Sequence, residues 1–168
     1  MTSPYTAPAG TRIGHVHLRV SDLERAIRFY RDVLGFAVQA RYGTQAAFLG
    51  APMPDGAGEY HHHIGLNTWG SHGGTPPPPG HTGLFHTAIL YPDRGALARA
   101  VRRVAEAGLT FTGASDHGVS EAVYLDDPDG NGLELYRDRA PVDWPRDADG
   151  KLKMFTAGLD LDDLLSAA

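Results

Sequence analysis

The sequence predicts an α+β fold built from two β-α-β-β-β halves. The 168-residue chain twice shows a strand-like run, then an amphipathic helix with a capping residue, then further strand-like runs. A segment rich in Pro and Gly, GSHGGTPPPPGHTG at 70–83, separates the two occurrences and lacks any pattern of regular structure. The second half ends in two strand-like runs joined by DDPDGNG, whose Pro, Asp, Asn and Gly residues are typical of a hairpin turn.

The first half contains one predicted helix among four predicted strands. The strands are expected at 13–20, 37–42, 45–49 and in the centre of 60–69. In the first of these, alternation places His15 and His17 on the same face. Ser21 or Asp22 is expected to cap the helix that follows, and Gly35 to end it.

The second half repeats this order and adds a carboxylate in its last strand. Its strands are expected at 84–91, 109–112, 121–125 and 132–136. Asp93 caps the predicted helix and Gly108 ends it. Glu134 lies between Leu133 and Leu135, so its carboxylate points to the face opposite the two leucines. A lone buried carboxylate is costly unless a cation accompanies it, which predicts a metal ion beside this strand.

The predicted domain organisation is one double-module domain with an extension at each end. We expect a flexible arm at 1–11, a domain at 12–140 with module one at 12–70, the linker at 70–83 and module two at 83–140, and a tail at 141–168. A short helix capped by Asp160 is predicted in the tail. It is expected to pack on a neighbouring surface or on a partner subunit.

Composition excludes several classes of function. The net charge of −5, without a run of Lys or Arg, argues against a nucleic-acid partner. No apolar run approaches the length of a membrane span, and the first residues lack the apolar core of a signal peptide, so we expect a cytoplasmic protein. The chain has no cysteine, and any metal must therefore be held by His, Asp or Glu.

Two of the nine histidines occupy equivalent places in the two halves. His15 and His86 both lie near the start of the first strand of their half. Together with Glu134 they form the two-histidine, one-carboxylate set that binds a divalent metal on one side and leaves the other side open. An isolated histidine is more often a hydrogen-bonded core or surface residue, but the recurrence in a repeat favours the metal site.

Two stretches carry a resemblance to a known family. GHVHLRVSDLERAIRFYRDVLGF at 14–36 and YLDDPDGNGLELY at 124–136 are similar to the opening and closing signatures of the vicinal oxygen chelate superfamily. That superfamily includes glyoxalase I, bleomycin-resistance proteins and extradiol ring-cleaving dioxygenases. The resemblance implies two βαβββ modules whose curved mixed sheet surrounds a metal site, and it is strongest to the catechol 2,3-dioxygenase-like branch.

The resemblance implies a non-haem extradiol dioxygenase that cleaves a catechol-like aromatic diol with O2. In that branch, the metal ligands match His15, His86 and Glu134, and the metal is Fe(II), with Mn(II) as an alternative. The acid/base histidine matches His63, whereas alternation sends its neighbour His62 to the opposite face. Tyr124 and His117 match residues that hydrogen-bond the substrate oxygens.

Two other functions stay open at this point. A glyoxalase-like isomerase or lyase would use Zn(II) or Ni(II) and consume no oxygen, and a binding protein of the same fold would hold a small molecule without catalysis. A homodimer is expected in each case.

Overall fold

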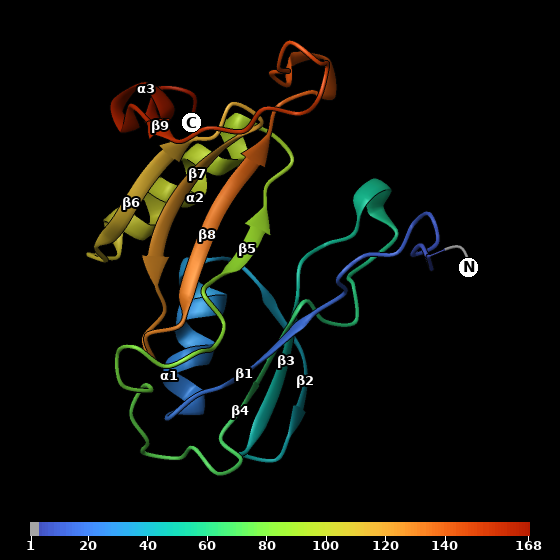
Figure 1. The fold of residues 1–168 in the computed structure, drawn as a ribbon. Helices are drawn as coiled ribbons and strands as arrows, with labels where there is room; N and C mark the ends of the chain where they lie inside the picture. The colour runs from blue at the N-terminus through green and yellow to red at the C-terminus, as the bar shows by residue number, and fades with distance from the viewer. Residues whose placement is uncertain (1–3) are drawn as a thin grey trace.

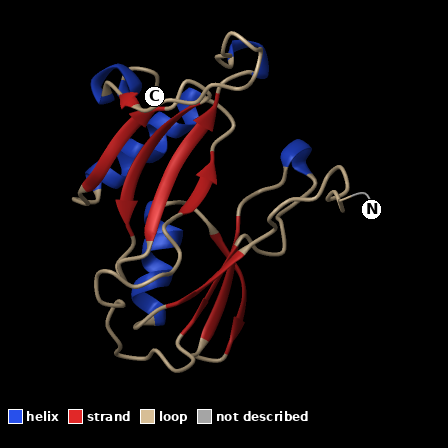
Figure 2. Ribbon diagram, viewed as in Figure 1, coloured by secondary structure: helices blue, strands red, loops and turns tan. Residues whose placement is uncertain are grey.

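The computed structural model describes residues 4–168 and shows the predicted α+β architecture (Figures 1 and 2). The first half comprises β1 (Val16–Arg19), α1 (Leu23–Arg28), β2 (Ala37–Tyr42), β3 (Ala46–Gly50) and β4 (Ile64–Asn67). The second half comprises β5 (Thr87–Leu90), α2 (Arg94–Glu106), β6 (Phe111–Asp116), β7 (Ser120–Asp126) and β8 (Gly132–Asp138). The tail adds β9 (Ala157–Gly158) and α3 (Leu161–Leu165). A π-helical turn, Phe29–Val33, extends α1, and short 3-10 turns occur at Pro54–Gly56 and Pro141–Asp143.

Each half forms its own mixed sheet with the same strand order. The first sheet runs β1-β4-β3-β2 and the second β5-β8-β7-β6, with β9 added at its far edge. In both sheets the first strand pairs in parallel with the last, whereas the remaining pairs are antiparallel. Figure 1 shows the second sheet above the first, with α2 lying behind the second sheet. The repeat in the sequence is therefore also a repeat in topology.

Aspartates cap the N-termini of α1, α2 and α3, because a carboxylate can accept a backbone N–H that the first helical turn leaves without a partner. Asp22 accepts from the backbone N–H of Arg25 at 3.0 Å, and Asp93 from that of Ala96 at 2.7 Å. Asp160 caps α3 in the same way. The structure thus selects Asp22 over Ser21 as the cap of α1.

The turn between β7 and β8 joins the two halves through buried Asp127. One carboxylate oxygen accepts the backbone N–H groups of Asp129 and Asn131, at 2.8 and 2.9 Å. The other accepts the hydroxyl of Tyr30, from the extension of α1, at 2.9 Å. Next to it, Asp129 accepts from the backbone and side chain of Ser21. The predicted hairpin therefore also connects module two to module one through these hydrogen bonds.

A single hydrophobic core is shared by both halves. It contains buried side chains from α1 and β4, such as Ile27 and Leu66, and from α2 and β8, such as Leu97 and Leu135. These residues lie on the helix-facing side of each sheet, so the opposite faces carry the alternating polar side chains. No helix within residues 4–168 is long and apolar enough to span a membrane.

Candidate active site

His86 and Glu134 meet on the polar face of the second sheet. The parallel register of β5 and β8 aligns Ala88 with Glu134, and His86 lies two residues before Ala88 on the same face. The Nε2 atom of His86 lies 3.0 Å from a carboxylate oxygen of Glu134. The Glu134 side chain is only 13% exposed, so the imidazole compensates part of the cost of burying the carboxylate.

Gly132 permits this contact, because a Cβ atom there would lie 2.2 Å from the carbonyl oxygen of Phe85 and 3.3 Å from the Cβ of His86. A larger residue would therefore push the 85–86 backbone away from β8. The glycine belongs to the turn motif DDPDGNG, but its role in seating His86 is visible only in the pairing of the strands.

Tyr124 bonds the other oxygen of the carboxylate. Tyr124 on β7 lies directly opposite Glu134 on β8, and its hydroxyl donates to Glu134 at 3.1 Å. Burial, together with the charge and hydrogen bond of Glu134, raises the pKa of Tyr124 to about 12. The phenol consequently stays protonated at neutral pH and acts as a donor.

His117 extends the chain of contacts toward the surface. Its Nε2 lies 2.7 Å from the Tyr124 hydroxyl, and its Nδ1 lies 3.0 Å from the backbone carbonyl oxygen of Phe155 in the tail. Four predicted site residues, His86, Glu134, Tyr124 and His117, thus form one continuous chain of polar contacts, in which the single hydroxyl hydrogen of Tyr124 can point to Glu134 or to His117. Phe155 was not predicted, since nothing in the sequence connects residues 38 positions apart.

The histidines of the first module contact one another instead, with tilted or edge-on rings. The ring of His15 lies 4.4 Å from that of His62, between centroids. His17 covers Gly65 of β4, where a Cβ atom would come within 2.8 Å of the His17 ring, and its ring lies 5.8 Å from Phe48. Burial, and then the charge of His15, lower the pKa of His62 and likewise that of His17.

His62, and not His63, is the histidine that lies beside His15. Regular alternation does not reach these two residues because β4 begins only at Ile64. The Nδ1 of His63 accepts the backbone N–H of Ala51 at 3.1 Å. A neutral ring in this arrangement carries its hydrogen on Nε2 and is a hydrogen-bond donor.

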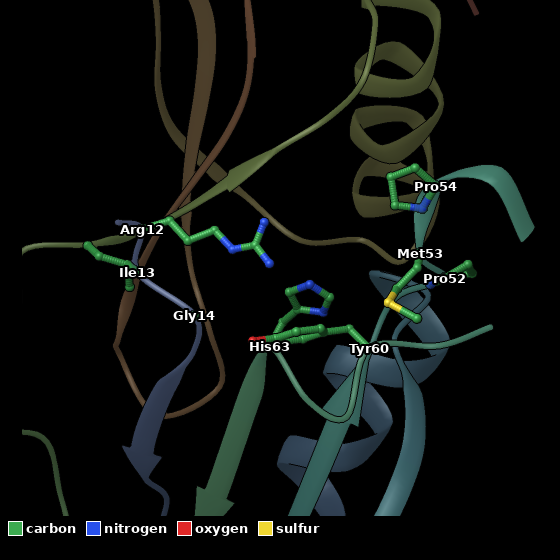
Figure 3. Close-up of a pocket in the computed structure, with 8 residues that line it drawn as sticks. All are labelled: Arg12, Ile13, Gly14, Pro52, Met53, Pro54, Tyr60 and His63. Carbon is green, nitrogen blue, oxygen red and sulfur yellow. The ribbon is translucent and has the colours of Figure 1, made fainter. Parts of the chain in front are cut away.

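The His63 ring lies 4.6 Å from that of Tyr60 and borders a cavity of about 250 Å³. Figure 3 shows the guanidinium of Arg12 directed toward His63, with Met53 at the other side of the cavity. Burial, followed by the charges of His61 and Arg12, lowers the pKa of His63.

A larger cavity of about 810 Å³ lies between the two sheets and is bordered by three of the predicted site residues, His15, His63 and His86. Its other lining side chains are mostly apolar and include Phe36, Ile64, Ile89 and Leu90. The volume and the mainly apolar lining with a few polar groups are typical of sites for small organic ligands.

The three predicted metal ligands do not meet as a set. His86 and Glu134 are in contact, and the Nδ1 of His86 is buried without a hydrogen-bond partner in the described structure. Such a pair fits two positions of a divalent metal. His15, however, lies on the other sheet, and residues 4–168 contain no group of three or more His, Cys, Asp or Glu side chains close enough to hold a metal ion.

Comparison with known proteins shows the family of the chain. Residues 12–135 match the model of the Glyoxalase/Bleomycin resistance protein/Dioxygenase superfamily. The chain is 39% identical over 158 residues to a catechol-2,3-dioxygenase of Bacillus subtilis, covering 94% of this chain and 52% of that protein. It is 30% identical to a lactoylglutathione lyase of Haemophilus influenzae, covering 77% of this chain and 94% of that protein.

The fold is also found in a solved structure. A glyoxalase/dioxygenase from Nostoc punctiforme superimposes with a TM-score of 0.61 at 22% identity, over 83% of this chain and all of that one. The chain spans about half the length of the catechol-2,3-dioxygenase, and nearly all of the lyase. By its sequence and its repeated topology, the chain belongs to the Glyoxalase/Bleomycin resistance protein/Dioxygenase superfamily.

Proposed function

We propose that this protein is an extradiol-type dioxygenase that cleaves a catechol-like aromatic ring with O2. The observation that supports the proposal most is the chain of polar contacts His86–Glu134–Tyr124–His117, which reaches the large cavity at His86. The 39% identity to a catechol-2,3-dioxygenase favours the same reaction class. The physiological metal is proposed to be Fe(II), with Mn(II) as an alternative.

His86 and Glu134 are the two residues that would hold the metal, with His15 as the proposed third ligand from the facing module. A divalent metal at this place would supply the binding of two vicinal substrate oxygens and of dioxygen. In this structure His15 is separate from the other two, and the described residues contain no group of three ligand side chains.

Tyr124 and His117 are proposed to take up a proton from a substrate hydroxyl. The hydroxyl hydrogen of Tyr124 first turns from Glu134 to Nε2 of His117. The substrate O–H bond then breaks as its proton moves to the Tyr124 oxygen, while the original phenol proton moves to Nε2 of His117 over the 2.7 Å contact. Tyr124 ends the step as a neutral phenol, and His117 becomes an imidazolium. This direction suits a phenol whose pKa is raised to about 12, since a lasting phenolate beside Glu134 would be unfavourable.

His63 is proposed to orient the substrate. With Nδ1 occupied by the Ala51 N–H, its Nε2–H can donate to an oxygen of a ligand in the cavity. The acid/base role that the family resemblance implies for His63 would require the contact with Ala51 to break.

The test is metal analysis of protein purified without chelator, followed by oxygen uptake on a panel of small catechols after anaerobic loading with Fe(II). We expect bound metal, oxygen consumption and a yellow ring-fission product. Tyr124→Phe should reduce turnover by roughly 100-fold with unchanged metal content, because it removes the proton conduit and keeps the ring. Tyr42→Phe, at an exposed tyrosine, is the matched control and should leave turnover unchanged.

A metal-dependent isomerase is the second candidate, since the chain covers 94% of a lactoylglutathione lyase. Zn(II) or Ni(II) in the purified protein, with anaerobic conversion of a hemithioacetal and no oxygen uptake, would replace the dioxygenase by this function. Ligand binding without metal and without turnover would instead identify a small-molecule binding protein.

A further inference from the structure

The tail after β8 returns to the site and lies across the loop that carries His117. Near its start, the indole Nε1 of Trp144 donates to the backbone carbonyl of Arg139 at 2.8 Å. Near its end, β9 pairs with β6 in antiparallel register, with Ala157 opposite Asp116. Between these two contacts the chain first loops outward, with Arg146 bridged to Leu152, and then returns so that Phe155 and Thr156 contact His117 in the loop that follows β6 (Figure 1).

Phe155 contacts His117 through its backbone in both directions. Its N–H donates to the His117 carbonyl oxygen at 3.4 Å, and its own carbonyl oxygen lies 3.0 Å from the Nδ1 of His117. The hydroxyl of Thr156 lies 3.3 Å from the same nitrogen. The opposite ring nitrogen, Nε2, faces Tyr124 at 2.7 Å. The His117 ring is thus held between the tail and the proposed proton conduit.

Gly118 makes room for this contact. Its φ of +77° is a left-handed conformation that other residues adopt at a cost. A Cβ atom on Gly118 would lie 2.5 Å from Cε1 of the Phe155 ring and 2.8 Å from Cγ of Pro145. Both the backbone conformation and the close approach of the tail therefore require glycine here.

The chemistry of the contact determines which ring nitrogen carries hydrogen. A carbonyl oxygen can only accept, so the contact with Phe155 requires a hydrogen on Nδ1. In the neutral ring Nε2 then accepts, and the single hydroxyl hydrogen of Tyr124 points to Nε2 at 2.7 Å, with Glu134 at 3.1 Å as its alternative acceptor. We propose that Phe155 is a positioning residue, whose backbone carbonyl fixes the Nδ1–H tautomer of His117 and leaves Nε2 as the nitrogen that exchanges a proton with Tyr124. The catalytic use of this tautomer rests on the proposed function, whereas the tautomer itself does not.

The tautomer can be measured directly in the full chain by long-range ¹H–¹⁵N NMR of the histidine rings, with His117→Gln used to assign the resonance. In the wild-type protein we expect the neutral His117 ring to carry its hydrogen on Nδ1. A neutral ring protonated on Nε2 would overturn the proposal without any reference to activity.

Gly118→Ala should displace Phe155 and return His117 to a mixture of tautomers. Gly150→Ala is the matched control, because Gly150 has φ +78° and nothing within 4 Å of its would-be Cβ, so it has the same backbone strain without the contact. Phe155→Ala keeps the carbonyl and should retain the Nδ1–H tautomer, as should Thr156→Val, which removes only the hydroxyl. Loss of the tautomer in Thr156→Val would assign the positioning to Thr156 instead.

The catalytic consequence is tested in the same variants. We expect kcat on a catechol to fall roughly tenfold in Gly118→Ala relative to Gly150→Ala, with metal content and KM unchanged, because acid–base transfer depends on the correct protonation state. A changed tautomer in Gly118→Ala with the same kcat as in Gly150→Ala would contradict the catalytic part of the inference. Absence of oxygen-dependent turnover in the wild-type protein would overturn the proposed function and leave the NMR result standing.

Discussion

The two modules have the same topology and a histidine at equivalent positions, yet the residue opposite on the neighbouring strand differs. By strand register, His15 corresponds to His86, and Gly65 on β4 corresponds to Glu134 on β8. In the second module a carboxylate therefore bonds the histidine, whereas in the first the equivalent space is filled by the ring of His17. The repeat duplicates the backbone topology. The residue on the neighbouring strand, Glu134 or Gly65, determines whether the repeated histidine has a carboxylate partner.

The polar side chains of the second module and the histidines of the first module are therefore held in different ways. The polar chain of the second module is held by hydrogen bonds between neighbouring strands and by the tail. The histidines of the first module contact each other through their rings and through one hydrogen-bonding contact, 2.8 Å between the Nδ1 atoms of His61 and His62. We therefore expect the second module to dominate metal binding and proton transfer, and the first to contribute mainly to the cavity.

The largest effect is expected for Glu134→Ala. It removes the group that bonds both His86 and Tyr124, so bound metal and oxygen-dependent turnover should fall below detection. Elemental analysis and oxygen uptake measure the two losses. Glu24→Ala, which removes an exposed carboxylate paired with Arg41, should behave as wild type. Full metal content in Glu134→Ala would contradict the assignment of this residue.

The next largest effect compares the two equivalent histidines. His86→Ala should weaken metal affinity by roughly 100-fold, and His15→Ala by roughly 10-fold, because only His86 is already in contact with Glu134. Competition with a metal chelator measures both affinities. Equal losses would show that His15 joins the other two ligands when metal binds, and would remove the proposed difference between the modules.

A smaller effect, on stability, is expected for alanine at Gly132 and Gly65, the two glycines whose neighbours leave little room for a Cβ atom. Gly132→Ala meets a backbone oxygen, so we expect it to destabilise the fold by about 1–3 kcal/mol and to separate His86 from Glu134. Gly65→Ala meets the side chain of His17, which can rotate away, and should cost less. Urea denaturation measures both free energies of unfolding. A larger cost for Gly65→Ala would mean that the first module is the more rigid one.

The smallest effect is a difference in pH dependence. The pKa values of His17, His62 and His63 are lowered, primarily by burial, so below pH 6.5 the unfolded chain binds more protons than the folded one. Their contribution to stability is complete above pH 6.5 and is lost as pH falls through the lowered pKa values.

In the second module the corresponding group is Glu121, which pairs with Arg94, Arg137 and Arg139. Burial opposes ionisation of Glu121, but the hydrogen bonds and charges of Arg137 and Arg94 outweigh it and hold its pKa below 4.5. Its contribution is present above pH 4.5 and is lost at lower pH. The free energy of unfolding, measured by urea denaturation at a series of pH values, should decline in two steps, one below pH 6.5 and one below pH 4.5. His62→Ala should reduce the first decline and Glu121→Gln the second. If the decline below pH 6.5 is unchanged in His62→Ala, His62 does not contribute to it.

Local rules explain which parts of the fold were predictable. Asp93 and Asp160 cap their helices as expected, because capping depends on neighbours in the chain. The strand predicted at 37–42 is β2, with the same bounds. The pairing of Tyr124 with Glu134 follows from the hairpin that joins their strands. The metal set His15, His86 and Glu134 stays a prediction, since only its second-module pair is in contact.

The sequence by itself determined the repeated β-α-β-β-β order, the helix starts and the hairpin that brings Tyr124 opposite Glu134. These features depend on periodicity, capping and turn chemistry, which act over a few residues. Only the tertiary structure decided that His62 lies beside His15, that Gly132 admits His86 and that the carbonyl of Phe155 reaches His117. Such contacts join residues distant in the chain, and they depend on how close two backbones approach, a quantity that no local pattern of side chains specifies.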